Sequence, residues 1–125
     1  PDDACWILGQ QAVALESWVD ARAREGVPFV VLGDFNRQLA DNGDELFAAI
    51  NDGEPENAVL TLVAEGRRST FWGSNRPFID HIVLDRQTAE WFAPSSFVLV
   101  DYEQEDWARE LSDHCPIRAT LRPTQ

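Results

Sequence analysis

The sequence contains neither methionine nor lysine, and it has only two cysteines and two histidines. Two cysteines are too few for the disulfide framework that staples many small secreted domains. No stretch approaches the roughly 20 apolar residues of a membrane-spanning helix, and no basic-then-apolar signal segment is present. Because the chain begins with Pro1 and lacks methionine, we expect a soluble piece processed or excised from a longer protein.

Positive charge is also scarce. The ten basic residues are all arginines scattered along the chain, and 22 acidic residues outnumber them, which leaves a formal net charge of −12. Tight non-specific binding to nucleic acid requires cations that neutralise several phosphates, so the charge argues against a protein that tracks along duplexes. It does not exclude a nuclease or a hydrolase of small phosphoesters, because a bound divalent metal brings one phosphate into an acidic pocket. A solvated acidic surface is the alternative explanation.

The length of 125 residues suits one modest domain with one core. Apolar residues at helical spacing predict an amphipathic helix over 10–25, ended by Gly26 and Pro28. The continuous β-branched run 29–33 predicts a central strand covered on both faces. The further expected elements are helices at 45–52 and 86–92, strands at 59–63, 78–84, 96–100 and 115–121, and a loop at 65–77. The pattern is mixed α and β without repeats.

Three short motifs place an aspartate where a strand meets a loop. They are GDFN at 33–36, IDHI at 79–82 and SDHCPI at 112–117. A carboxylate at the edge of an apolar run costs stability unless a metal, histidine or arginine compensates it, so three of them suggest a shared site. Taken alone, GDFN also fits an ordinary loop with Asx turns.

Strand geometry predicts how these residues meet. Asp34 follows the C-terminal end of its strand, whereas Asp80 and Asp113 stand near the N-terminal ends of theirs, so antiparallel pairing would bring all three to one edge. Side chains alternate between sheet faces, so Asp80 points away from His81. We therefore predict that Asp80 pairs across strands with His114 and fixes its tautomer. We interpret His81 as a buried structural residue.

The order and spelling of the three motifs, from Gln10 to Leu121, resemble the second half of the endonuclease/exonuclease/phosphatase superfamily, the deoxyribonuclease I-like phosphoesterases. The resemblance implies that residues 1–125 are the C-terminal half of a four-layered α/β sandwich, with a mixed, mostly antiparallel sheet and flanking helices. It implies a metal-dependent nuclease or phosphodiesterase that hydrolyses phosphodiester bonds, with nucleic acid among the expected substrates. The compartment of the parent protein stays open, with secreted and periplasmic as alternatives.

Roles for the motif residues follow from this chemistry and match what the resemblance implies. Asp34 would orient or deprotonate the attacking water, and Asn36 would hydrogen-bond the phosphoryl oxygens. His114, with Asp80 as its partner, would stabilise the transition state or exchange a proton. Asp113 and Asp34 are the expected ligands of Mg²⁺ or Mn²⁺.

The loop before Asp80 supplies candidate substrate contacts. Trp72 would stack on a base or sugar, and Arg76 would hold a phosphate. Packing of Trp72 in the core or at its rim is the alternative.

The resemblance also implies that some metal ligands of the family are missing from this sequence. Relatives place a metal-binding asparagine and glutamate in a first half that is not in this sequence, so Mg²⁺ should bind weakly. A lone half would expose an apolar sheet face. The rival hypothesis is a catalytically inactive half-domain that packs on a second copy as a homodimer. A third alternative is a missing N-terminal half that is held non-covalently.

Overall fold

The computed structural model describes residues 3–124, so Pro1 lies outside the described residues. The fold is mixed α+β with antiparallel sheets, as predicted. The helices are α1 (Asp3–Glu25), α2 (Glu45–Ile50), α3 (Arg86–Trp91) and α4 (Ala108–Leu111), and the 3₁₀ turns are η1 (Phe71–Gly73) and η2 (Pro94–Ser96). The strands are β1 (Val30–Asp34), β2 (Thr61–Leu62), β3 (Arg68–Ser69), β4 (Arg76–Pro77), β5 (Asp80–Leu84), β6 (Val98–Leu99) and β7 (Ile117–Arg118).

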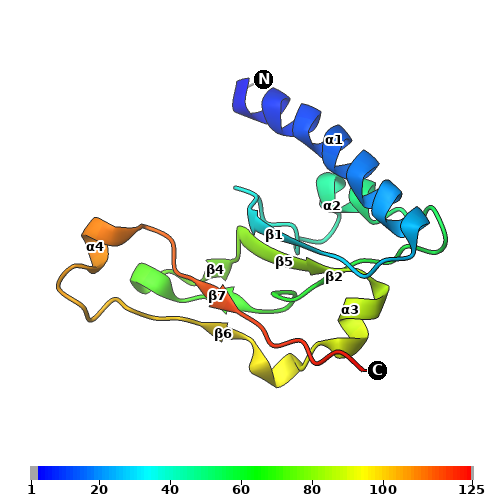
Figure 1. The fold of residues 1–125 in the computed structure, drawn as a ribbon. Coiled ribbons are helices and arrows are strands. Elements are labelled where there is room, and N and C mark those ends of the chain that lie inside the picture. The colour runs from blue at the N-terminus through cyan, green and yellow to red at the C-terminus, as the bar shows by residue number, and fades with distance from the viewer. Residues whose placement is uncertain (1–2, 125) are drawn as a thin grey trace.

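The strands form small antiparallel sheets. The largest has the order β1-β5-β2, while β3 pairs with β4 and β6 pairs with β7. In Figure 1, α1 and α2 lie on one side of the β1-β5-β2 sheet, and β6 and β7 lie on the other. None of the helices within residues 3–124 has the length and apolar character needed to cross a bilayer.

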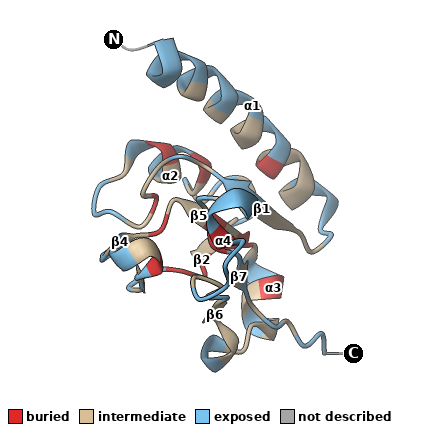
Figure 2. Ribbon diagram, turned by 90° about the vertical axis from the view of Figure 1, so that its left-hand side faces the viewer, coloured by how far each residue is buried: buried red, intermediate tan, exposed pale blue. Residues whose placement is uncertain are grey.

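The core lies between α1, α2 and the β1-β5-β2 sheet. Its buried members are Val19, Leu39, Leu46, Ile50, Leu60, Leu62 and Val83. Leu8, Ala12 and Leu15 form a stripe at helical spacing along α1 and pack against this cluster. Most of α1 is nevertheless exposed, and Figure 2 shows one buried position, near its C-terminal end. The stripe therefore anchors α1 along one narrow face.

The predicted start of the first helix at residue 10 was wrong by seven residues, because α1 already begins at Asp3. Only Gly9 weakens the helical pattern before residue 10, and one glycine inside a helix costs about 1 kcal/mol, too little to break it. The predicted end is confirmed, since Gly26 adopts φ 66° directly after the helix, a conformation that glycine reaches without strain.

The prediction that residues 29–33 form a central strand covered on both faces was wrong. Within the described residues β1 is an edge strand, and β5 occupies the centre of the sheet. Val31 packs toward the core, whereas Leu32, on the opposite face, is 70 % exposed. A continuous apolar run is compatible with burial on both faces, but it does not itself supply the second covering layer.

The segment 65–77, predicted as a loop, contains the β3–β4 hairpin and η1. Its pairing escaped detection because it lacks apolar alternation and ends in Pro77. The strands predicted at 59–63, 96–100 and 115–121 exist but are shorter, since β2, β6 and β7 have two residues each. Leu121 adds an isolated bridge to Phe92.

An acidic cluster joins α1 to the segment after α2. Carboxylate oxygens of Glu16, Asp20 and Asp52 lie within 4.8 Å of one another. Oε2 of Glu16 and Oδ1 of Asp20 are buried and find no hydrogen-bond partner among residues 3–124. Burial raises the pKa of Glu16, and the charges of Asp52 and Asp20 raise it further. The folded state therefore holds a proton on Glu16 more readily than the unfolded chain does.

We predict that Glu16→Gln stabilises the protein at neutral pH. A raised folded-state pKa means that ionised Glu16 destabilises the fold above that pKa, and that the penalty vanishes below the unfolded-state pKa. The gain should be at least the roughly 0.2–0.5 kcal/mol typical of like-charged i,i+4 pairs. Urea unfolding at neutral and acidic pH measures it, with Glu90→Gln on α3 as the control. An equal gain at both pH values would contradict the explanation.

Candidate functional site

The pairing of β1 with β5 brings two of the motif aspartates together. Residues 30–34 pair with residues 84–80, so that Asp34 lies directly opposite Asp80. Directly opposed residues of an antiparallel pair project to the same face, with Cβ atoms about 4.5–5.5 Å apart. The predicted meeting of GDFN and IDHI at one edge of the sheet is therefore confirmed.

His114 joins these aspartates from the loop before β7. Its Nδ1 lies 2.9 Å from Oδ2 and 3.1 Å from Oδ1 of Asp80, which confirms the predicted pairing across strands. Because a carboxylate only accepts, Nδ1 carries the proton that it donates to Asp80. Nε2 of His114 is thereby directed to the other side, where it lies 3.6 Å from Oδ2 of Asp34.

Negative charge surrounds the imidazole. The hydrogen bond to Asp80 raises the pKa of His114 more than partial burial lowers it, and the charges of Asp80, Asp34 and Asp113 add to the rise. The side chain of His114 is 35 % exposed, so a substrate can reach it. Asp113 places Oδ1 3.9 Å from Nε2, but its own side chain is 95 % exposed. The site thus favours an imidazolium ion in contact with solvent.

His81 occupies the opposite face of β5, as alternation predicts. It is 1 % exposed, and its ring packs edge-on against Phe35 at a centroid distance of 5.7 Å. Nε2 lies 3.0 Å from the carbonyl oxygen of Arg37 and 3.4 Å from the backbone nitrogen of Leu39. Because a carbonyl oxygen only accepts, the shorter contact places the proton on Nε2. Burial lowers the pKa of His81. These contacts agree with the interpretation of His81 as structural.

The GDFN turn is held by its own aspartate. The backbone N–H of Asn36 donates to Oδ1 of Asp34 at 2.7 Å, which is an Asx turn. Asn36 adopts φ 49°, a left-handed conformation that asparagine tolerates better than most residues. The turn leaves Oδ2 of Asp34 facing His114, and it leaves Asn36 exposed.

Two hollows meet at the Asp80–His114 pair. Asp34 lines one of about 410 Å³, whose other walls include Leu32, Ile82 and Ile117. Asn36 lines the second, of about 320 Å³. Asp34 and Asn36 thus approach the pair from different hollows.

The second hollow also contains both predicted substrate residues. Arg76, on β4, is exposed and lines it together with Trp72 and Asp113. The Trp72 ring, however, has the guanidinium of Arg109 over it at 4.3 Å, and Phe71 packs against it at 4.7 Å. A substrate base would have to displace Arg109 to stack there. The geometry therefore favours the alternative that Trp72 packs at the rim.

The predicted metal ligands are only partly brought together. Asp34, Asp80 and His114 present ligand atoms within 4.8 Å of one another, and Asp113 is not in that group. Asp80 and Nδ1 of His114 already bind each other, so Asp34 and Asp113 remain as oxygen donors on the Nε2 side. This donor set is not assembled around one ion, because Asp34, His114 and Asp113 do not form a group within 4.8 Å of one another. The exposed side chain of Asp113 would have to turn toward Asp34 for the two carboxylates to share Mg²⁺ or Mn²⁺.

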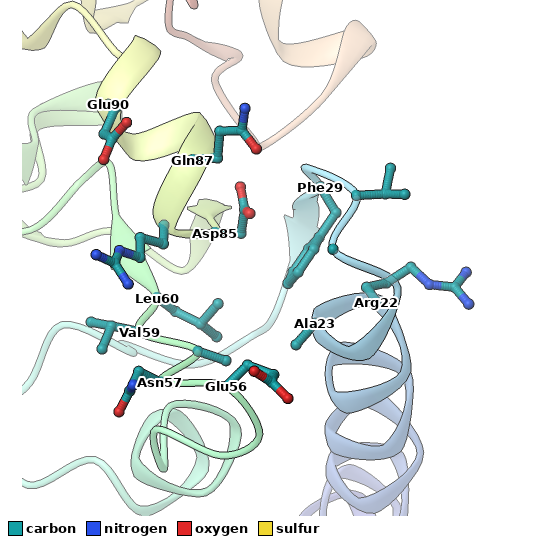
Figure 3. A pocket seen from close by; sticks show the side chains of 14 residues that line it. Arg22, Ala23, Phe29, Glu56, Asn57, Val59, Leu60, Asp85, Gln87 and Glu90 are labelled. Atoms are coloured by element: carbon teal, nitrogen blue, oxygen red, sulfur yellow. The ribbon is translucent and has the colours of Figure 1, made fainter.

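A separate cavity of about 380 Å³ opens at the other end of β1, and no residue of the three motifs lines it. Figure 3 shows it between the end of α1 and α3, with Phe29 and Leu60 among its apolar walls. Glu56, Asp85 and Glu90 contribute carboxylates, and Asp85 caps α3. Neither histidine lines it.

Sequence reasoning missed Tyr102, whose hydroxyl lies 2.6 Å from the carbonyl oxygen of His114. It also missed Arg109, which covers Trp72, and Glu103, which accepts a hydrogen bond from the backbone N–H of Trp72. All of them lie in the acidic segment 101–110, where no motif or periodicity marks a contact with the site.

We predict that the two histidines titrate on opposite sides of the ordinary histidine pKa, His114 above and His81 below. Asp80→Asn should lower the pKa of His114 toward its ordinary value, because the largest cause of the rise is the bond to Asp80. The pKa of His81, held down by burial, should stay low. Ring-proton NMR across a pH series resolves both. An unchanged pKa of His114 in Asp80→Asn would contradict the assignment.

Comparisons of the chain with family models, with curated proteins and with solved structures find no match. The likeness to the endonuclease/exonuclease/phosphatase superfamily therefore stays a prediction from the three motifs.

Proposed function

We propose that this domain belongs to a metal-dependent phosphoesterase that hydrolyses phosphodiester bonds, as a nuclease or phosphodiesterase does, and that it forms half of a deoxyribonuclease I-like sandwich. The observation that carries the proposal is the Asp80–His114 pair, whose free Nε2 lies 3.6 Å from Asp34. A carboxylate that orients an imidazole beside a second carboxylate supplies both a base and an acid.

The attacking water is oriented by Oδ2 of Asp34, which accepts its proton as the new P–O bond forms. The fixed Nε2–H of His114 donates to a phosphoryl oxygen and stabilises charge that builds up on it. As the bond to the leaving alkoxide breaks, His114 supplies the proton that the alkoxide takes. The raised pKa of His114 keeps that proton available near neutral pH.

Asn36 and Arg76 complete the binding of the phosphate. Both are exposed and line the hollow of about 320 Å³ that includes His114. The Asn36 side chain offers amide N–H donors to phosphoryl oxygens, and the Arg76 guanidinium binds a phosphate through paired N–H groups.

Asp34 and Asp113 would hold Mg²⁺ or Mn²⁺ on the Nε2 side of His114. When bound, the ion neutralises charge that develops on the phosphate. Two carboxylates without further charged ligands support weak binding.

The acidic surface narrows the substrate class. Arg76 is the single arginine among the residues that line this hollow, and the net charge of the chain is −12. Such a surface favours a small or single-stranded phosphodiester over a duplex.

We predict that the protein hydrolyses a chromogenic phosphodiester in the presence of Mg²⁺, and that His114→Ala lowers kcat by about 10²–10⁴-fold, the usual contribution of a positioned proton-transfer group. Steady-state kinetics measure the change. Asp41→Asn, in an exposed turn, is the matched control and should leave kcat unaltered. Equal activity of His114→Ala and the unmodified protein would refute the assignment.

A second candidate function is that of a catalytically inactive half-domain that associates with a second copy. The exposed apolar face beside the site favours it. Leu32 is 70 % exposed and Leu111 is 64 % exposed, and both line the hollow of about 410 Å³ with Ile82, Pro116 and Ile117. Such a face is commonly covered by another polypeptide.

If a second copy covers this face, light scattering should give the mass of a dimer, and Leu32→Arg should give that of a monomer, because a buried unpaired charge opposes association. Val13→Arg, on the outer surface of α1, is the control and should remain a dimer. A monomeric unmodified protein would exclude this candidate.

A further inference from the structure

The loop that carries Asp113 and His114 is held by a residue from another segment. The hydroxyl of Tyr102 lies 2.6 Å from the carbonyl oxygen of His114 and 3.1 Å from that of Ser112. A phenol has one proton, and the shorter distance places it mainly on the His114 carbonyl. Within the loop, the backbone N–H of His114 donates to Oγ of Ser112 at 3.0 Å.

The Tyr102 ring is itself held on two sides. Trp107 stacks on it at a centroid distance of 5.7 Å and an interplanar angle of 16°, and Phe71 packs against it at 5.1 Å. Aromatic contacts of this kind fix a ring at small entropic cost, since tyrosine has few rotatable bonds. The hydroxyl therefore has a defined position.

Two further hydrogen bonds connect the residues after His114 to Val100. The N–H of Val100 donates to the carbonyl oxygen of Pro116 at 2.8 Å, and the thiol of Cys115 donates to the carbonyl oxygen of Val100 at 2.7 Å. These bonds fix residues 115–116, whereas the hydroxyl of Tyr102 reaches the backbone of His114 itself from outside the loop.

We propose that Tyr102 is a positioning residue, whose hydroxyl holds the backbone of His114 so that Nδ1 stays on Asp80 and Nε2 stays directed at Asp34. The effect of Tyr102 on hydrolysis rests on the proposed function, whereas its effect on the orientation and tautomer of the His114 imidazole does not. Tyr102 lines the hollow of about 410 Å³ that also contains Asp34 and His114. It acts through the loop and does not transfer a proton.

Tyr102→Phe tests the proposal, because it removes the hydroxyl and keeps the ring between Phe71 and Trp107. The matched control is Ser96→Ala. Oγ of Ser96 donates to the carbonyl oxygen of Ala93 and accepts from the N–H of Thr120 at 2.8 Å, so it bridges the segments that flank β6 and β7 at the end away from His114. Both variants lose one hydroxyl, and both should unfold at a slightly lower temperature.

Ring ¹⁵N NMR of the neutral histidines gives the first measurement. Nδ1–H is the single tautomer expected for His114 in the unmodified protein and in Ser96→Ala. In Tyr102→Phe we expect a mixture with Nε2–H, the form that free imidazole side chains prefer in water, while the signals of buried His81 stay constant as an internal reference. An unchanged His114 tautomer in Tyr102→Phe would overturn the proposal.

Steady-state kinetics give the second measurement. Tyr102→Phe should lower kcat about tenfold with KM unchanged, a fraction of the about 10²–10⁴-fold that a positioned proton-transfer group contributes, and Ser96→Ala should leave kcat unaltered. If the unmodified protein shows no hydrolysis while the tautomer still changes in Tyr102→Phe, the proposed function fails and the positioning role stands. An equal loss of kcat in Tyr102→Phe and Ser96→Ala would mean that Tyr102 contributes only to the stability of the fold, and it would overturn the proposal.

Discussion

The antiparallel register of β1 against β5 sets Asp34 directly opposite Asp80, and the rest of the candidate site depends on that pairing. A slip of one residue would turn Asp80 to the face where His81 is now buried among core side chains. Burial of one face of β5 therefore fixes the register that keeps Asp80 on the exposed face. His114 then completes the group from outside the sheet, through its bond to Asp80.

Electrostatics give the cluster its chemical character. The hydrogen bond to Asp80 and the negative charges of Asp80, Asp34 and Asp113 stabilise the imidazolium form of His114 and so raise its pKa. In the proposed function, the same excess of negative charge would attract a divalent cation to the oxygens of Asp34 and Asp113, and it would oppose the approach of polyanions. The proposed proton donor, cation site and preference for small substrates would thus share one physical cause.

How much the sequence predicts depends on how local the determining contacts are. Alternation along 78–84 separates Asp80 from His81 and predicts the Asp80–His114 pair, because the period of two is a property of the backbone. Burial of β1 was mispredicted, since an apolar run does not reveal whether a second layer covers Leu32. Arg109 over Trp72 and Tyr102 on His114 join segments more than ten residues apart without a motif, and only the folded chain shows them.

The central claim is that Asp34 and His114 work as one unit on a phosphodiester, and a double-mutant cycle tests it most directly. The kcat/KM values of Asp34→Asn, His114→Ala and the double variant are compared with that of the unmodified protein in the presence of Mg²⁺. Residues that act as a unit show strongly non-additive losses. We expect the double variant to be barely worse than the more impaired single variant. Additive losses, or an unmodified protein without hydrolytic activity, would contradict the account.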